Sequence, residues 1–97
     1  MRRVVWNSLA KSDYFENIDF LLNRWSERVA QDFIDEVRNV EYLLAQGNVD
    51  FLETSRLDVR RCVLCKQIVL YYRVVDGNTV ELLRFWNSHQ NETRLEL

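Results

Sequence analysis

The sequence contains no proline, two glycines, two cysteines and one histidine in its 97 residues. Two cysteines cannot build a disulfide-rich secreted scaffold, and Gly47 and Gly77 lie too far apart for a glycine-rich phosphate loop. The longest uninterrupted apolar run, Ile68 to Tyr72, is far shorter than the roughly 20 residues that cross a membrane. We expect no leader, because Met1-Arg2-Arg3 runs directly into a strand-like piece. These absences predict a cytoplasmic protein that does not enter a membrane.

The composition is that of one folded domain. Hydrophobic residues make up 47% of the chain and charged residues 29%, which is typical of globular proteins and excludes disorder as the main state. The length fits a single domain over residues 1–97. The net charge is −2, but between Arg56 and Arg73 five basic residues accompany only one acid, Asp58. We expect this segment to form a basic surface for phosphate or for an acidic protein.

Two adjacent helices are predicted after a short strand at residues 3–7. The first, residues 8–24, has an apolar face that continues to Trp25, and the second covers residues 26–46. The apolar residues of the second helix follow steps of three and four: Ala30, Phe33, Val37, Val40 and Leu44. Because one or two residues separate the helices, we expect a helical hairpin. Trp6, Trp25 and Phe33 are expected in the core.

Three strands are predicted after residues 48–56, which have no clear period. They cover about 57–64, 68–75 and 79–86, and Asp76-Gly77-Asn78 forms the hairpin turn between the last two. The expected fold class is α+β, with the strands in an antiparallel sheet and both helices on one face of it. The other face must meet water or a partner, so we expect the function there.

Cys62-Val63-Leu64-Cys65 and His89 are weak candidates for chemistry. A structural zinc site needs four ligands, and these residues leave it one short. The cysteine pair ends a strand, whereas a thioredoxin motif opens a helix. His89 has no serine or cysteine partner at motif spacing. We therefore predict two ordinary cysteines and no metal, cofactor or nucleophilic catalysis.

Aromatic and basic residues are interleaved on the last two strands, in Tyr71-Tyr72-Arg73 and Arg84-Phe85-Trp86. Two interpretations fit this pattern. Such a sheet surface can stack bases and hold phosphates. Alternatively, arginine stems pack over aromatic rings of the neighbouring strand. The residues alone favour the packing.

Several segments of the chain form an ordered set. They are Val4-Val5-Trp6 leading to Leu9-Ala10, Trp25 to Phe33, Asp58 to Leu64, Leu70 to Val74, Val80 to Trp86 and, at the close, Gln90-Asn91. This set resembles the RelE/ParE toxin superfamily of bacterial type II toxin–antitoxin modules over nearly the whole chain, and it is closer to the ParE-like members. The resemblance implies the toxin of a plasmid-stabilisation or addiction system. A cognate antitoxin would neutralise it by folding a disordered tail onto its surface.

The superfamily divides by target. RelE-like members cut mRNA in the ribosome, which requires a general base, a general acid and cations around the phosphate. The residues that would serve under this alternative are Arg60, Arg61, Arg84 and His89. Most of the constellation is absent, because Ile68-Val69 stand where an arginine would be expected and no tyrosine follows Tyr72.

ParE-like members instead inhibit DNA gyrase through a protein–protein contact that needs no catalytic residue. The resemblance therefore favours a non-enzymatic toxin, with a ribosome-dependent ribonuclease and an inactive toxin homologue as alternatives. The implied partners are the antitoxin and gyrase, or the ribosome and mRNA, and a homodimer or a toxin–antitoxin hetero-oligomer would fit. The predicted partner-binding residues, expected on the uncovered and positively charged face, are Arg60, Arg61, Tyr71, Arg73, Arg84 and Trp86.

Overall fold

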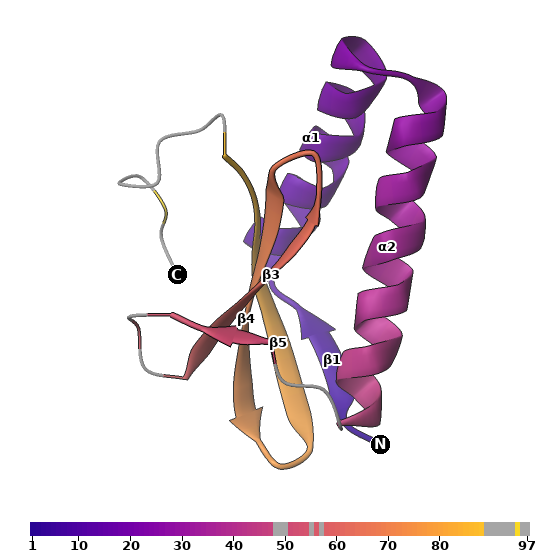
Figure 1. The fold of residues 1–97 in the computed structure, drawn as a ribbon. Coiled ribbons are helices and arrows are strands. Elements are labelled where there is room, and N and C mark those ends of the chain that lie inside the picture. Colours follow the sequence, from indigo (N-terminus) through magenta and orange to yellow (C-terminus); the bar gives the residue numbers. More distant parts are fainter. Residues whose placement is uncertain (48–50, 55, 57, 89–94, 96–97) are drawn as a thin grey trace.

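The computed structural model describes residues 1–47, 51–54, 56, 58–88 and 95. Within these residues the chain forms two layers, a five-stranded sheet and a pair of helices on one of its faces (Figure 1). The helices are α1 (Ser8–Arg24) and α2 (Glu27–Gln46). The strands are β1 (Arg3–Trp6), β2 (Leu52–Glu53), β3 (Val59–Cys65), β4 (Ile68–Asp76) and β5 (Thr79–Asn87). The predicted α+β class with a helical hairpin against the sheet is confirmed.

Local capping sets the ends of both helices. The Asn7 side-chain oxygen accepts a hydrogen bond from the Ala10 N–H at 2.8 Å, and Ser26 Oγ accepts one from the Val29 N–H at 3.1 Å. These bonds satisfy N–H groups that lack a partner in the first helical turn. Gly47 ends α2 at a φ of 81°, a left-handed conformation that strains other residues. Neither described helix has the length and apolar character to cross a membrane.

The strand order is β1-β5-β4-β3-β2. β3, β4 and β5 form the predicted antiparallel meander, but β1 pairs with β5 in parallel. The expectation of a purely antiparallel sheet is therefore wrong, and the path of the chain explains why. The Arg2 N–H donates to the Ala45 carbonyl oxygen at 2.7 Å, so the helical hairpin returns the chain to the end where β1 begins. β3 starts from this end and runs in the direction of β1, β4 runs back, and β5 reverses again. β5 therefore runs in the same direction as β1.

Two details of the strands differ from the prediction. The short strand β2 pairs with Arg60 and Arg61 of β3, although its segment has no sequence period. β3 begins at Val59 instead of residue 57, which lies outside the described residues. The turn between β3 and β4 consists of Lys66 and Gln67, both with positive φ, 44° and 70°. This geometry is typical of a type I′ turn, which normally favours Asn and Gly.

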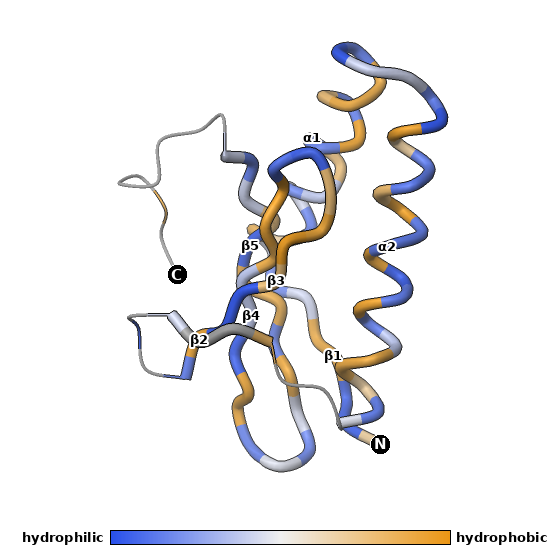
Figure 2. Tube along the Cα trace, viewed as in Figure 1, coloured by the Kyte–Doolittle hydropathy of each residue, from blue (hydrophilic) through white to orange (hydrophobic). Residues whose placement is uncertain are grey.

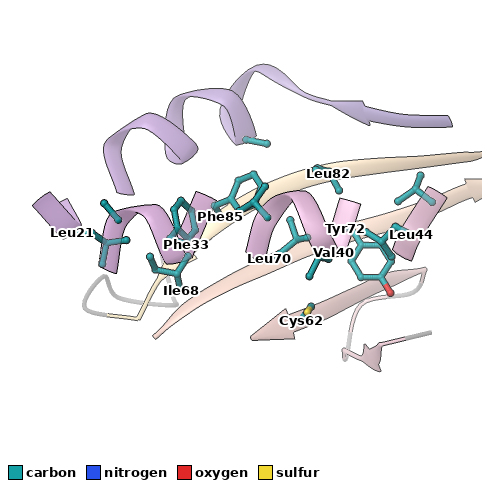
Figure 3. Close-up of a cluster of buried hydrophobic side chains, with 14 residues drawn as sticks. Leu21, Phe33, Val40, Leu44, Cys62, Ile68, Leu70, Tyr72, Leu82 and Phe85 are labelled. Atoms are coloured by element: carbon teal, nitrogen blue, oxygen red, sulfur yellow. The ribbon is translucent and has the colours of Figure 1, made fainter. Parts of the chain in front are cut away.

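The main core lies between the helices and the sheet (Figure 3). The predicted apolar face of α2 is buried and consists of Ala30, Phe33, Val37, Val40 and Leu44. Figure 2 shows hydrophobic residues on the side of α2 toward the sheet and hydrophilic ones on the other side. Phe33 is fully buried, and its ring centroid lies 6.2 Å from that of Phe85 in β5 (Figure 3). Trp6 packs against this core, as expected.

The end of α1 is more exposed than predicted. Leu21 is fully buried, whereas Leu22 and Trp25 are about half exposed. The prediction that Trp25 is a core residue is therefore wrong. Trp25 lies at the tip of the helical hairpin, and the Lys66 ammonium is 4.2 Å from the centroid of its ring. This cation–π contact connects the helical hairpin to the β3–β4 turn.

Candidate partner-binding surface

The face of the sheet opposite the helices, which we call the reverse face, carries a second apolar cluster. Its buried members are Val59, Val69, Tyr71, Leu83 and Trp86, and a partly buried Leu95 packs against them. Strand alternation explains the set, because every second side chain of a strand points away from the helices. The reverse face is therefore partly covered by the chain itself, and two of the predicted site residues, Tyr71 and Trp86, belong to its apolar cluster.

Trp86 places a polar group inside this cluster. It is only 4% exposed, and its Nε1–H has no acceptor among the residues that the structure describes. A buried donor without an acceptor costs about 1–3 kcal/mol. In the strand register, Trp86 is opposite Val69, and Val69 is opposite Val63, which is 63% exposed. The cluster thus continues into an exposed apolar position on β3.

Arg61 and Arg73 flank the cluster on the reverse face. Arg61 is opposite Tyr71 in the register, and Arg73 is opposite Val59. Arg73 Nη2 lies 3.3 Å from Glu81 Oε1 in a partly exposed ion pair, and such pairs contribute little to stability. Two of the predicted cations are therefore placed beside the apolar cluster, where an acidic partner could reach them.

Arg60 lies on the other face, contrary to the expectation of one shared basic face. Successive side chains of a strand point to opposite faces, so Arg60 and Arg61 are separated by the sheet. Arg60 is opposite Tyr72, whose ring belongs to the main core. Its Nη1 donates to the Phe51 carbonyl oxygen at 2.9 Å, and the Phe51 N–H donates to the Tyr72 hydroxyl at 3.1 Å. Arg60 thus holds the residue that precedes β2.

Arg84 is engaged in an internal ion pair. Its Nε and Nη2 donate to the two carboxylate oxygens of Asp13 in α1 at 2.6 and 3.0 Å, and both side chains are largely buried. The Arg84 guanidinium also lies 5.2 Å from the centroid of the Trp86 ring. A shift in register beside Tyr71 and Tyr72 marks a β-bulge in this part of the sheet. Bulges re-aim side chains, and the period of the sequence does not reveal them.

The side chains of Asp13 and Asn17 form hydrogen bonds with the backbone of β5 where that strand extends beyond β1. The pairing with β1 ends at Leu82. Beyond it, Asp13 Oδ2 accepts a hydrogen bond from the Phe85 N–H at 3.1 Å, and Asn17 Nδ2 donates to the Phe85 carbonyl oxygen at 2.9 Å. Two side chains one helical turn apart therefore replace a neighbouring strand. Sequence reasoning missed both residues, although polar residues four apart on a buried helix face were the available signal.

Cys62 and Cys65 are free thiols. Burial, assisted by the negative charge of Glu36, raises the pKa of Cys62 to about 11 and also raises the pKa of Cys65. A thiol with a raised pKa is a poor nucleophile and a poor metal ligand. Among the described residues, no three metal-binding side chains lie together, and His89 is outside these residues. The surroundings of the two thiols are those of structural cysteines.

The outer edge of β3 is open along its second half. β2 pairs only with Arg60 and Arg61, and within the described part of the chain no strand pairs with the outer side of Cys62 to Cys65. Unpaired N–H and C=O groups on such an edge can bind an added strand. This edge adjoins the exposed Val63, so a partner strand here would also reach the reverse face.

Comparison with known proteins identifies the family. A family model described as the ParE toxin of the type II toxin–antitoxin system parDE matches residues 4–92. The fold is similar to that of the chromosomal ParDE toxin–antitoxin system from P. aeruginosa, with a TM-score of 0.69 and 18% identity over 90% of this chain and 96% of that chain. It is also similar to a conserved hypothetical protein from Helicobacter pylori, with a TM-score of 0.53 and 25% identity over 87% and 91% of the two chains. No curated protein sequence matches.

The family match covers both helices, the meander and the reverse-face cluster from Val59 to Trp86. The structural matches show the same fold over most of each chain. The resemblance inferred from the ordered segments of the sequence is thereby confirmed. The chain belongs to the ParE toxin family of type II toxin–antitoxin systems.

Proposed function

We propose that this protein is a non-enzymatic toxin that acts in the cytoplasm, inhibits DNA gyrase through a protein–protein contact and is neutralised by a cognate antitoxin. Family membership supports the toxin role. The observation that carries the non-enzymatic part is the division of the arginines. Arg60 lies on the helix face of the sheet, Arg61 lies on the reverse face, and Arg84 is bound by Asp13.

A ribonuclease would need these cations together. RNA cleavage through the 2′-hydroxyl requires positive groups that converge on the phosphate, beside a base and an acid. Arg60 and Arg61 cannot converge, because the sheet lies between their side chains. Arg84 would first have to leave a largely buried carboxylate, which is costly. A protein target needs only an exposed surface of suitable shape and charge, so the geometry favours a protein–protein mode of action.

The same surfaces support an antitoxin as a partner. A disordered acidic tail that folds on binding can wrap a large surface and bear its ordering cost at that moment. The open edge of β3 offers backbone groups for an added strand, and Arg61 and Arg73 offer positive charge on the adjoining reverse face. We expect toxin and antitoxin to form a hetero-oligomer in which these surfaces are covered.

Gyrase supercoiling tests the proposed target. Antitoxin-free protein is added to purified gyrase and relaxed plasmid, and the topoisomers are separated on a gel. We expect supercoiling to fall at micromolar toxin and to recover when toxin is first mixed with the antitoxin encoded beside it. An unrelated protein of similar size and net charge, added at the same concentration, serves as the control for non-specific effects. Undisturbed supercoiling at micromolar toxin would remove the gyrase proposal.

Two further assays separate the alternatives. Toe-printing of translated mRNA would show cuts at the ribosomal A site if the protein were a RelE-like ribonuclease. Induction in growing cells would leave growth unchanged, with antitoxin binding intact, if the chain were an inactive homologue. Under the proposal, toe-prints are unchanged and growth stops on induction.

A further inference from the structure

The outer side of α1 carries apolar side chains that the fold leaves exposed. Phe15, Leu22 and Trp25 are 65%, 45% and 54% exposed. With the partly buried Ile18 they follow steps of three, four and three along the chain, so they form one stripe on the helix. The stripe ends at Trp25, where the helical hairpin turns back (Figure 1). Exposed apolar groups that are contiguous mark an interaction surface.

The ring of Trp25 is held in place although it is exposed. The Lys66 ammonium lies 4.2 Å from the ring centroid. Lys66 and Gln67 form the β3–β4 turn at positive φ, which residues other than glycine and asparagine adopt only at a cost in stability. The contact of Lys66 with Trp25 helps to offset this cost. A ring that is already ordered loses little conformational freedom when a partner binds it.

The charge at this end of the molecule is positive. Residues 22–28 with the turn at 66–67, which we call the hairpin tip, contain three basic residues and one acid, Glu27, whereas the whole chain has a net charge of −2. Arg24 and Lys66 are exposed and form no ion pair with any residue that the structure describes. Cations without an ion pair attract a surface of opposite charge. The partner that fits the hairpin tip is therefore acidic.

We propose that the hairpin tip is the surface through which this toxin binds its target protein, and that the target presents an apolar hollow bordered by carboxylates. Trp25 and Leu22 enter the hollow, and Arg24 and Lys66 meet its acidic border. The inference rests on the proposed function, since that function makes gyrase the target, and it names the residues of the toxin that make the contact.

Trp25 carries the largest share of the expected binding energy. Tryptophan and arginine are the residue types that dominate protein–protein contacts, and both occur here, at Trp25 and Arg24. A half-exposed tryptophan still has a large apolar area to bury, and Leu22 lies on the same stripe three residues earlier. Burial of both side chains removes apolar area from water, while the neighbouring cations orient the partner.

The hairpin tip is separate from the surfaces proposed for the antitoxin. Those surfaces are the reverse face and the outer edge of β3 from Cys62 to Cys65, and this edge ends next to Lys66. An antitoxin strand on the edge would stop beside the hairpin tip, where it obstructs the approach of a large target without contacting Trp25. Target and antitoxin thus use different residues, and substitutions at the hairpin tip should separate toxicity from neutralisation.

Four variants of the intact chain test this inference. Trp25→Ala and Lys66→Glu change the hairpin tip, and Tyr42→Ala and Arg3→Glu are the matched controls. Tyr42 is a 60% exposed aromatic residue on α2 and Arg3 is an exposed cation on β1, so each control makes a comparable change elsewhere. The readouts are growth on induction, gyrase supercoiling and affinity for the antitoxin encoded beside the toxin. Circular dichroism checks that each variant is folded.

We expect Trp25→Ala to require about 30-fold more toxin for half-inhibition of supercoiling, the effect of losing one binding hot spot. Lys66→Glu should inhibit less still, because it sets a carboxylate against the acidic border of the target and removes the cation that holds the ring. Neither variant should arrest growth at the expression level at which wild type does, and both should bind the antitoxin as tightly as wild type. Tyr42→Ala and Arg3→Glu should match wild type in all three assays. Trp25→Phe, which keeps an aromatic ring, should recover most of the inhibition.

Two outcomes would overturn the inference. Folded Trp25→Ala and Lys66→Glu proteins that arrest growth like wild type would show that the contact between these residues only supports the fold. Parallel loss of growth arrest and antitoxin binding would place both partners on one surface.

Failure of the proposed target has a different signature. Wild type would then leave supercoiling intact, while growth arrest still separates the two variants of the hairpin tip from their controls, and the inference would hold for another target protein. Wild type that leaves growth unchanged would contradict the toxin role, and with it the inference, before any variant is compared.

Discussion

Asp13 carries a carboxylate at a buried position of α1, where the neighbouring turns present Ala10 and Leu21 to the core. Burial of a charge is unfavourable unless it is paired and hydrogen-bonded. Here the carboxylate accepts two bonds from Arg84 and one from the Phe85 N–H, so both oxygens are occupied. One residue therefore neutralises a cation, caps a strand edge and attaches α1 to the sheet.

Removing this carboxylate should be strongly destabilising. In Asp13→Ala the Arg84 guanidinium and the Phe85 N–H lose their acceptor, and loss of one member of a buried pair costs about 3–5 kcal/mol. Urea unfolding followed by circular dichroism measures the change in free energy of unfolding. Asp19→Ala, on an exposed position of the same helix, should stay within about 0.5 kcal/mol of wild type. Equal stability of both variants would show that the ion pair is dispensable.

Cys62 makes stability depend on alkaline pH. Its thiol titrates near pH 9 in an ordinary environment, and burial raises its pKa to about 11 in the folded protein. Between these two values the unfolded chain has released the proton and the folded chain has kept it, so the free energy of unfolding falls as pH rises. Below pH 9 both states hold the proton and the contribution is fully present.

The Cys62→Ala variant isolates this effect from other groups that titrate in the same range. We expect its free energy of unfolding to fall less than that of wild type between pH 9 and pH 11. Urea unfolding at a series of pH values gives both curves. Alkylation by iodoacetamide provides a second readout and should be slow in folded protein and fast in urea. Parallel pH curves would contradict the raised pKa.

At the scale of elements, Phe33 is the buried aromatic side chain through which α2 packs against the sheet. Phe33 is fully buried and contacts the rings of Tyr14 and Phe85 at centroid distances of 5.7 and 6.2 Å. It therefore joins both helices to β5. Phe15 on α1 is also an aromatic residue, but it is 65% exposed. The two positions differ in burial and share the same side chain.

This pair gives a matched prediction. Phe33→Ala should lower the free energy of unfolding by about 3–5 kcal/mol, because it removes transfer energy and leaves a cavity. Phe15→Ala should change it by less than about 0.5 kcal/mol, since its ring is mostly in water already. Denaturant titration of both variants measures these two changes in the free energy of unfolding. A midpoint for Phe33→Ala close to wild type would show that the core can close over the lost ring.

The turns show how an element can form without its usual residues. Asp76 Oδ1 accepts a hydrogen bond from the Asn78 N–H at 2.7 Å, and this side-chain bond shapes the predicted β4–β5 turn. The β3–β4 turn instead has positive φ at Lys66 and Gln67, residues that gave no turn signal beyond their polarity. The contact of Lys66 with Trp25 and the pairing of the flanking strands hold it in place. Tertiary contacts here override local preference.

At the scale of the whole molecule, β1 connects the two layers. It pairs with β5, and Trp6 Nε1 donates to Glu41 Oε2 of α2 at 2.9 Å. The radius of gyration is 13.0 Å, which matches the value of about 13 Å for one compact domain of about 100 residues. The stability of the sheet and that of the helices are therefore expected to depend on each other. An unfolding experiment tests whether the chain behaves as one domain.

We expect the chain to unfold in one cooperative transition. Tryptophan fluorescence reports on Trp6, Trp25 and Trp86, which sample the core, the helical tip and the reverse face, while far-ultraviolet circular dichroism reports on the helices. The two probes should give the same midpoint in urea. Separate midpoints would show that the helical hairpin and the sheet unfold independently. An equal urea midpoint for wild type and Leu95→Ser would further show that the contact of Leu95 with the reverse-face cluster adds little to the free energy of unfolding.

The arrangement of charge is also a property of the whole molecule. Five basic residues between Arg56 and Arg73 predicted one basic face, and alternation along β3 instead sends Arg60 and Arg61 to opposite sides. Arg84 joins the helix layer through Asp13. A count of charges along the sequence could not reveal this division, because it depends on which partner each arginine meets across the fold.

The sequence by itself determined the order of the elements apart from the short strand β2, the helical hairpin, the buried face of α2 and the family. These features depend on local periodicity, on capping residues such as Asn7, Ser26 and Gly47, and on the order of short segments. Each of them is encoded by residues a few positions apart, so the pattern can be read directly.

Only the tertiary structure decided the parallel pairing of β1, the pairing of Asp13 with Arg84, and the burial of Trp86 in the reverse-face cluster. Each of these contacts joins elements that are distant in the sequence. Their energies depend on burial and on the geometry of the partner, and neither is set until the layers have packed. The candidate site residues were therefore proposed from the sequence, and the fold shows on which face each one lies and which residues of the chain it contacts.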